Sequence, residues 1–142
     1  MPRWARYALL ILWVGFIWAH SLVPADTSTE ESDFFAQLIA PLLGRLGIHE
    51  WDTVTFLVRK TAHFLEYLVL GLLNWGAVSS EPAPALPAAL IAALVIVGVP
   101  AVDETIQLFV AGRSGQVSDI LLDVCGGTIG YAGRVALSRR RS

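Results

Sequence analysis

The chain has 142 residues, of which 55% are hydrophobic and 15% are charged, with a formal net charge of −2. This length suits one domain. A soluble domain carries about 25% charged residues, so the composition argues against an ordinary soluble protein and favours a membrane protein. The single cysteine, Cys125, excludes an internal disulfide bond.

Four apolar stretches approach or exceed the length that a helix needs to cross a bilayer, about 20 residues. They predict an all-α fold: one integral membrane domain, residues 1–142, built as a four-helix bundle. Between the second and third stretches, the proline-rich sequence SSEPAPALP predicts a short turn. The expected helices are about 7–23, 54–78, 86–108 and 117–137.

The polar connection at residues 24–53 predicts a short amphipathic helix on the membrane surface, between the first two spans. Ser28 or Thr29 precedes acidic residues in the order expected for a helix start. Phe34 and Leu38 then begin an apolar face. An irregular loop is the alternative.

The first apolar stretch also has an alternative interpretation, as a cleaved signal peptide. Arg3 and Arg6 precede it, and VPA at residues 23–25 resembles a signal-peptidase site. The apolar run is long for a signal core, however, and tryptophans recur within it. We therefore expect a retained helix.

Basic residues predict the orientation of a membrane protein, because they concentrate on the cytoplasmic side. Arg3 and Arg6 flank the start of the first helix, and further arginines crowd the end of the fourth. The 24–53 connection is acidic, with Arg45 as its one arginine. We expect a multi-pass protein of the cell membrane with both termini in the cytoplasm and the acidic connection outside.

The second expected helix carries polar side chains within an apolar sequence. At 100° per residue, Arg59, His63 and Glu66 fall within an arc of roughly 60°. Lys60 and Tyr67 widen that face. A charged side chain in hydrocarbon costs about 2.5–3.5 kcal/mol on insertion scales, so this face is expected to point toward partners on other helices.

Alternating helix directions place those partners. The start of the second helix, the end of the third and the start of the fourth all fall in the outer half of the membrane. Polar residues occur at the end of the third helix, at the start of the fourth and on the connection between these two helices. They are Asp103, Glu104, Gln107, Arg113, Asp119 and Asp123. Gly126, Gly130 and Gly133 share a face with the two aspartates of the fourth helix, and such spacing lets helices approach closely.

Two interpretations of this cluster stay open. The charges can hold the helices together as buried ion pairs, or they can form a site for a polar ligand. In a site, Arg59 and Arg113 suit a phosphate or carboxylate group. His63 suits proton transfer near neutral pH, and Glu66 suits a general acid or base.

A metal site is a further alternative. His63 and Glu66 at positions i and i+3 are half of a motif found in di-metal helix bundles, which Asp103 or Glu104 would complete. A second Glu-x-x-His motif is missing and two cationic residues lie alongside, so we expect no metal and no other cofactor.

The remaining residues of chemical interest carry weaker signals. His20 and His49 are interpreted as isolated residues at the membrane interface, and Cys125 as a small packing residue. There is no phosphate-cradling loop and no basic aromatic patch, so nucleic acid is not an expected partner.

Two blocks of the sequence resemble the VanZ-like family of bacterial membrane proteins. They are RKTAHFLEYLVLG and DETIQLFVAGRSGQVSDILLDVCGGTIG. The family pattern has Lys-x-x-His-Phe-x-Glu-Tyr, then Asp-Glu-x-x-Gln, an arginine after a small turn, and an aspartate before a glycine-rich helix. The matching positions are Lys60, His63, Phe64, Glu66, Tyr67, Asp103, Glu104, Gln107, Phe109, Gly112, Arg113, Asp119, Gly127 and Gly130.

Two positions depart from the family pattern. Asp123 stands where the family usually has asparagine, and Ala111 where proline is common. The founding member is linked to low-level resistance to the glycopeptide antibiotic teicoplanin. The resemblance therefore implies a cell-envelope role at the outer side of the membrane and an effect on glycopeptide susceptibility, while the reaction stays open.

The sequence thus predicts a polytopic membrane protein that binds an anionic envelope lipid or a lipid-linked precursor. The alternatives are a membrane-embedded acid/base enzyme on the same substrate class and a structural or accessory subunit; oligomerisation stays open. His63 and Glu66 are the candidate acid/base residues. The candidate ligand-binding residues are Arg59, Lys60, Tyr67, Asp103, Glu104, Gln107, Arg113, Asp119 and Asp123.

Overall fold

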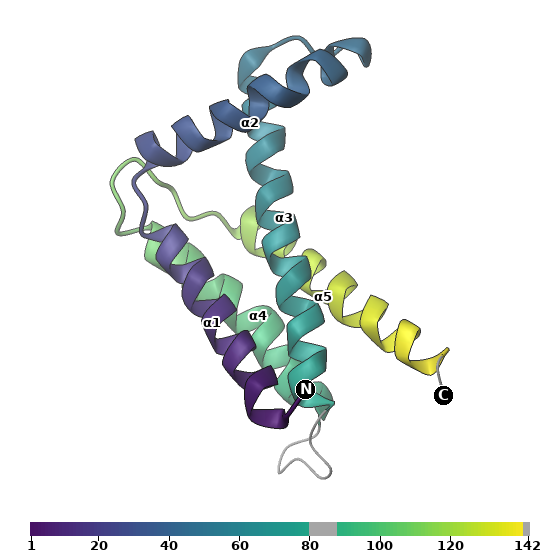
Figure 1. The fold of residues 1–142 in the computed structure, drawn as a ribbon. Helices are drawn as coiled ribbons and strands as arrows, with labels where there is room; N and C mark the ends of the chain where they lie inside the picture. Colours follow the sequence, from purple (N-terminus) through teal and green to yellow (C-terminus); the bar gives the residue numbers. More distant parts are fainter. Residues whose placement is uncertain (80–87, 141–142) are drawn as a thin grey trace.

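Five α-helices form the regular structure in the part of the chain that this computed structural model describes, residues 1–79 and 88–140 (Figure 1). The all-α expectation is confirmed for these residues, and the predicted proline-rich turn lies outside them apart from Ser79. The helices are α1 (Arg3–Ser21), α2 (Ala25–Arg45), α3 (Trp51–Val78), α4 (Ala88–Gln107) and α5 (Val117–Arg139).

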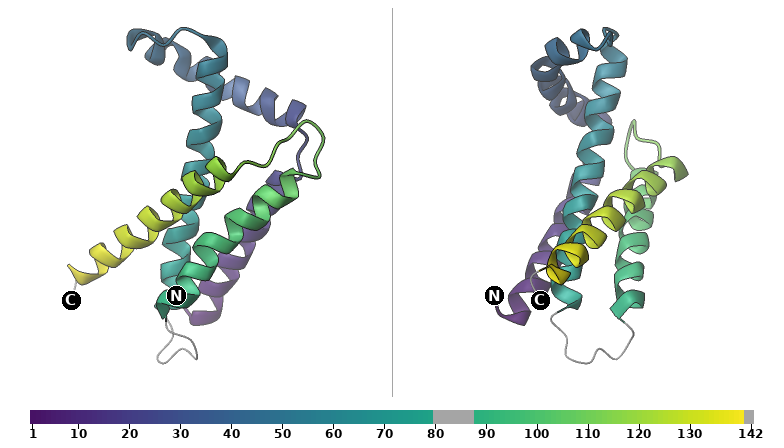
Figure 2. Two further views of the ribbon diagram at one scale, coloured as in Figure 1. Left: turned by 180° about the vertical axis from the view of Figure 1, so that it is seen from behind. Right: turned by 90° about the vertical axis from the view of Figure 1, so that its right-hand side faces the viewer.

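The central element is α3, which contacts each of the other four helices. α1 and α4 contact each other as well, and both run alongside α3 (Figure 2). α2 turns away from α1 by 107° and crosses the far end of α3. α5 runs outward from α3 at an angle, so the helices form a more open arrangement than a regular four-helix bundle. The N-terminus and the end of α5 lie away from α2 (Figures 1 and 2).

Two helices among the described residues, α4 and α5, are long and apolar enough to cross a membrane by themselves, and α1 with α2 qualifies as a bent pair. α3 does not qualify, although it has 28 residues, because Arg59, Lys60 and Glu66 interrupt its apolar sequence. The four crossings are therefore not confirmed and stay a prediction.

α2 is longer than the short surface helix predicted before α3, and it starts earlier. It begins at Ala25, directly after Pro24. Proline suits this boundary because its φ is already fixed and it lacks an N–H. The prediction that Ser28 or Thr29 caps the helix was wrong: Thr29 lies inside it, and its Oγ1 donates a hydrogen bond to Ala25 O at 2.8 Å.

One side of α2 exposes large apolar side chains. Phe34, Leu38 and Leu42 leave 60%, 65% and 60% of their surface exposed, whereas Ala36 is fully buried. An amphipathic helix of this kind lies well in the interface between water and lipid. The predicted surface position of this segment therefore fits its exposed side chains.

α3 and α5 approach each other through glycines of α5. A Cβ at Gly126 would lie 2.6 Å from Phe64 O, and one at Gly130 would collide with Leu68 O. Any side chain at these positions would push the helices apart. The prediction that small residues on this face let the helices approach closely is therefore confirmed for Gly126 and Gly130. The prediction was wrong for Gly133, whose Cβ position has no described neighbour within 4 Å, because α5 has diverged from α3 there.

Candidate functional site

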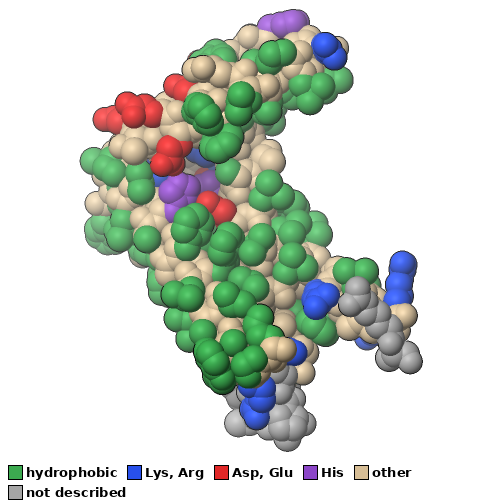
Figure 3. All heavy atoms as spheres, in the orientation of Figure 1, with side chains coloured by type: hydrophobic (Ala, Val, Ile, Leu, Met, Phe, Trp, Pro, Cys, Tyr) green, Lys and Arg blue, Asp and Glu red, His purple; other side chains and the backbone are tan. Residues whose placement is uncertain are grey.

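A polar pocket of about 130 Å³ lies at the α2 end of the molecule, between α2, α3 and the loop that joins α4 to α5. Figure 3 shows acidic and histidine side chains gathered beneath α2, whereas hydrophobic side chains dominate the surface below them. The pocket is lined by Ala25, Ser28, Phe56, Arg59, Lys60, His63, Gln107, Gly112, Arg113, Ser114, Gln116 and Asp119.

An ion pair joins α3 to α5 at the pocket wall. Lys60 Nζ and Asp119 Oδ1 are in close contact, and their side chains are only 22% and 20% exposed. The ammonium group also lies 5.4 Å from the ring centroid of Phe56, within the range of a cation–π interaction. The expected pairing of cations on the second span with carboxylates on the fourth is confirmed here.

Arg113 is positioned by the loop between α4 and α5. The preceding residue, Gly112, has a φ of 74°, a conformation that favours glycine. Arg113 Nε donates a hydrogen bond to Val23 O at 2.9 Å, and its buried Nη2 has no hydrogen-bond partner among the described residues. Burial lowers the pKa of Arg113 from its ordinary value, so its charged form would gain from an anionic partner.

Arg59 and Tyr67, both on the predicted polar face of α3, differ in exposure. Arg59 is exposed at the pocket wall, and no described carboxylate forms an ion pair with it. Tyr67 is fully buried in the core, and its hydroxyl has no hydrogen-bond partner within residues 1–79 and 88–140. Arg59 therefore has no counter-ion among the described residues, whereas Tyr67 lies close enough to Asp103 of α4 to interact with it.

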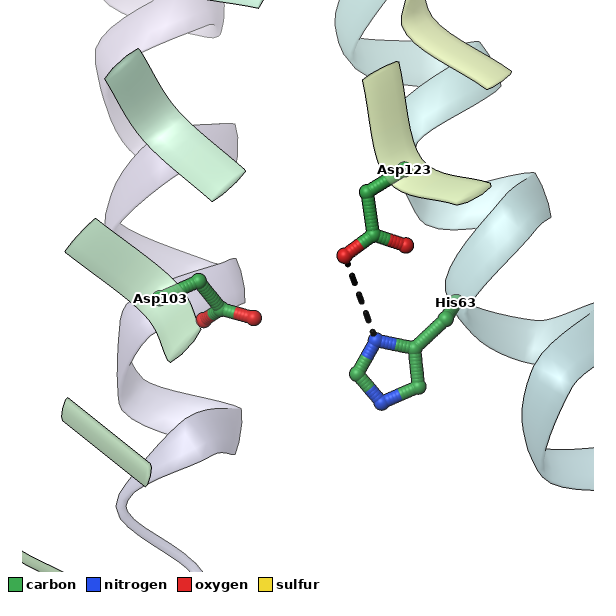
Figure 4. A group of neighbouring side chains, drawn as sticks. All are labelled: His63, Asp103 and Asp123. Carbon is green, nitrogen blue, oxygen red and sulfur yellow. Dashed lines mark ion pairs between the residues drawn. The ribbon is translucent and has the colours of Figure 1, made fainter. Parts of the chain in front are cut away.

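His63 of α3, Asp103 of α4 and Asp123 of α5 converge beside the pocket (Figure 4). One ligand-type atom of each lies within 4.8 Å of the other two. His63 Nδ1 lies 3.9 Å from Asp123 Oδ2, and both aspartates are fully buried. The prediction that polar groups from three separate helices meet is confirmed at these residues.

Hydrogen bonds hold the two acidic side chains at the end of α4. Asp103 accepts hydrogen bonds from Ser21 Oγ and from Gln107 Nε2 at 3.3 Å. Glu104 accepts one from the backbone N–H of Gln116 at 2.8 Å and one from Gln107 Nε2 at 3.2 Å. These bonds tie α4 to the end of α1 and to the start of α5.

Glu66 has a different partner from His63, although the two are one turn apart. Glu66 Oε1 lies 3.1 Å from His20 Nδ1, and His20 Nε2 lies 3.3 Å from Glu31 Oε2. The interpretation of His20 as isolated was therefore wrong, since it links α1, α2 and α3. Two carboxylates around one ring favour its doubly protonated form, because a neutral imidazole has a single N–H donor.

Three residues of this region were missed by the sequence analysis: His20, Ser21 and Gln116. The argument from helix direction would have found the first two, because the first expected helix also ends in the outer half of the membrane. Gln116 acts through its backbone N–H, which no side-chain pattern reveals.

These features define a class: an all-α membrane protein with apolar helices around a buried polar cluster. The model of the VanZ/LLP1 family matches residues 7–137, nearly the whole chain. The chain therefore belongs to the VanZ/LLP1 family, and the resemblance of its two sequence blocks is confirmed. Comparisons with curated proteins and with solved structures find no match.

Proposed function

We propose that this membrane protein binds the anionic headgroup of an envelope lipid or of a lipid-linked envelope precursor in the pocket beneath α2. The observation that carries the proposal is the charge of the pocket wall. The charged side chains lining it are three cations, Arg59, Lys60 and Arg113, and one carboxylate, Asp119. Because Asp119 already pairs with Lys60, the two arginines are left to attract an anion.

The size and position of the pocket support a small charged group. A volume of about 130 Å³ has room for a phosphate or carboxylate group with a few waters, since one water takes about 30 Å³ in the liquid. α2 borders the pocket through Ala25 and Ser28, and its exposed apolar side would lie in the same interface as a lipid headgroup.

The proposal includes a multi-pass topology in the cell membrane, with both termini in the cytoplasm and the pocket on the outer side. Arginines lie near both ends of the chain and acidic residues on α2, which is the distribution that the positive-inside tendency predicts. An outward pocket also suits an effect on glycopeptide susceptibility, because such antibiotics act outside the membrane.

The site residues divide into three roles in this proposal. The cations hold the headgroup, and His63 with Glu66 sets the protonation of the site. The remaining side chains orient these groups from α3, α4 and α5; they are Tyr67, Asp103, Glu104, Gln107, Asp119 and Asp123.

Native mass spectrometry tests the binding directly. Protein purified from its own membrane in mild detergent is expected to carry a phosphate-bearing lipid. Arg113→Gln is expected to raise the Kd for added short-chain phosphatidic acid by about tenfold to a hundredfold, because hydrogen bonds to charged groups are worth about 1.5–3 kcal/mol. Binding by Arg113→Gln and His63→Ala at wild-type strength would contradict the proposal.

Arg45→Gln is the matched control for this experiment. Arg45 is an exposed arginine at the end of α2, outside the pocket lining. The substitution removes the same charge, so a general electrostatic effect would weaken binding in both variants. A specific pocket predicts that Arg45→Gln binds the lipid within about twofold of wild type, a difference of roughly 0.4 kcal/mol.

A structural role for part of the cluster is a second candidate, favoured by one observation. The Lys60–Asp119 pair and the Ser21–Asp103 hydrogen bond both join different helices. Such contacts fit an accessory subunit whose charges hold its helices in register. In that case single substitutions would lower the melting temperature. The amount of lipid bound would then fall only in proportion to the amount of folded protein.

A further inference from the structure

The group formed by His63, Asp103 and Asp123 would carry an unbalanced charge with both of its carboxylates ionised. Two carboxylates are fully buried there, and a buried charge needs a counter-charge, a metal ion or a proton to be stable. Within the described residues, no donor reaches His63 Nδ1 or either carboxylate oxygen of Asp123. Asp123 is thus a buried acid aimed at a histidine without a hydrogen bond to it (Figure 4).

Among the described residues, no lysine or arginine forms an ion pair with Asp103 or Asp123, although Arg113 interacts with Asp103 at longer range. Lys60 is engaged by Asp119, and the described hydrogen bond of Arg113 goes to the backbone at Val23. Arg59 is exposed at the pocket wall. The three-residue group therefore lacks an amino-acid counter-ion.

The distances within the group fit a shared ion better than a direct hydrogen bond. The 3.9 Å between His63 Nδ1 and Asp123 Oδ2 is too long for a hydrogen bond, which needs about 2.7–3.2 Å. Two metal–ligand bonds of about 2.1 Å each span at most about 4.2 Å. One small cation can therefore lie between these two atoms. Asp103, whose ligand atom lies within 4.8 Å of both, completes the group with a small movement of its side chain.

We propose that His63, Asp103 and Asp123 bind one divalent first-row transition metal ion, such as Zn²⁺ or Mn²⁺. A neutral imidazole suits zinc and its neighbours in the series, and carboxylates suit manganese and other hard cations. Ser21 and Gln107 donate hydrogen bonds to Asp103, and such outer contacts commonly orient a metal ligand. Three protein ligands leave a coordination position open.

This metal site differs from the one considered in the sequence analysis. That alternative combined His63 with Glu66 of the same helix and with Asp103 or Glu104, and no metal was expected. In the structure, Glu66 instead pairs with His20. Asp103 and Asp123, from two other helices, lie beside His63. The proposal does not depend on the lipid-binding function, because the ion is held by protein atoms alone.

Metal uptake by the purified wild-type protein is the primary test. Protein without a polyhistidine tag is stripped with a chelator in detergent, delipidated, and titrated separately with Zn²⁺ and Mn²⁺. We expect one bound ion per chain by elemental mass spectrometry and a rise in the melting temperature, because binding to the folded state alone stabilises it. A folded wild-type protein that takes up neither ion would overturn the proposal.

Asp123→Asn tests the assignment of the ligands. Asparagine has nearly the same size and shape as aspartate and places no charge in the buried group, so the variant is expected to fold. Its affinity for the ion is expected to fall by at least about tenfold, while Asp52→Asn, the same change at an exposed position at the start of α3, stays within about twofold of wild type. Equal affinity in Asp123→Asn and wild type would contradict the assignment.

A spectroscopic measurement keeps the test decisive if a variant is unstable. Co²⁺ added to the stripped wild-type protein is expected to give visible absorption bands that change in His63→Gln and persist in Glu66→Gln. Bands that are lost in Glu66→Gln and unchanged in His63→Gln would instead support another set of ligands. Because no lipid is added, failure of this test leaves the headgroup proposal standing, and the reverse also holds.

Discussion

The polar residues of this protein divide into those with partners and those without. Lys60 is paired with Asp119 across two helices, whereas Asp123 and the Nη2 of Arg113 have no hydrogen-bond partner in the described structure. A paired group contributes mainly to the fold, while an unpaired buried group costs free energy that a ligand can recover. The two kinds of residue should therefore respond differently to substitution.

Lys60 gives a prediction about stability. Lys60→Met leaves Asp119 without its counter-charge and is expected to lower the free energy of unfolding by about 1–2 kcal/mol, between the values for exposed and buried pairs. Thermal unfolding in detergent measures the change. The exchanged pair, Lys60→Asp with Asp119→Lys, is expected to recover most of the loss, and no recovery would indicate that the ion pair does not join α3 to α5.

At the scale of helices, the packing of α5 against α3 determines where its aspartates lie. Gly126 and Gly130 bring the two backbones close together, and Asp123 is one turn before these glycines. A shift of α5 away from α3 would therefore separate Asp123 from His63. The same contact lets the end of α5 run away from α3 at an angle (Figure 1), with Arg134 still over the ring of Trp75, while the start of α5 contributes to the site.

Gly130 and Gly133 give a matched pair of substitutions on α5. Gly130→Ala is expected to destabilise the protein by about 1–3 kcal/mol, because the new methyl group collides with the carbonyl group of Leu68. Gly133→Ala has room for its methyl group and is expected to be neutral or to stabilise the helix by up to about 1 kcal/mol. Melting temperatures of both variants in the same detergent test this difference.

For the whole molecule, topology decides which side of the membrane the pocket faces. The N-terminus and the end of α5 lie at the end of the molecule opposite α2 (Figures 1 and 2). Among the described residues, two single helices are long and apolar enough to cross a membrane, and α1 with α2 adds a third as a bent pair. The proposed four crossings further require α3 to lie in the membrane with its charges turned toward its partners.

Reporter fusions and cysteine labelling test this topology. Green fluorescent protein fused to either terminus is expected to fluoresce, and alkaline phosphatase at the same positions to be inactive. In a Cys125→Ser background, Glu30→Cys on α2 is expected to react with a membrane-impermeant maleimide in intact cells. Active phosphatase at one terminus alone would require an odd number of crossings and would contradict the proposal.

Much of the fold and part of the site could be predicted from the sequence. The apolar stretches, the all-α class, the polar face of α3 and the two family blocks are local patterns, because helix formation and membrane affinity depend on neighbouring residues and their spacing. The convergence of His63 with acids from α4 and α5 also followed, since alternating helix directions place their ends at one level.

The tertiary structure decided which of these residues meet. The sequence places Glu66 and Asp123 equally well beside His63, but the ion-pair contact of His63 is with Asp123. The close approach of α5 to α3 at glycines brings Asp123 in, while Glu66 pairs with His20 of α1. The crossing angle of α5, the turn of α2 and the backbone contact at Gln116 likewise depend on packing between distant segments. Such contacts leave no periodic pattern in the sequence. They are determined by how the helices pack against one another, and no single helix sequence determines them.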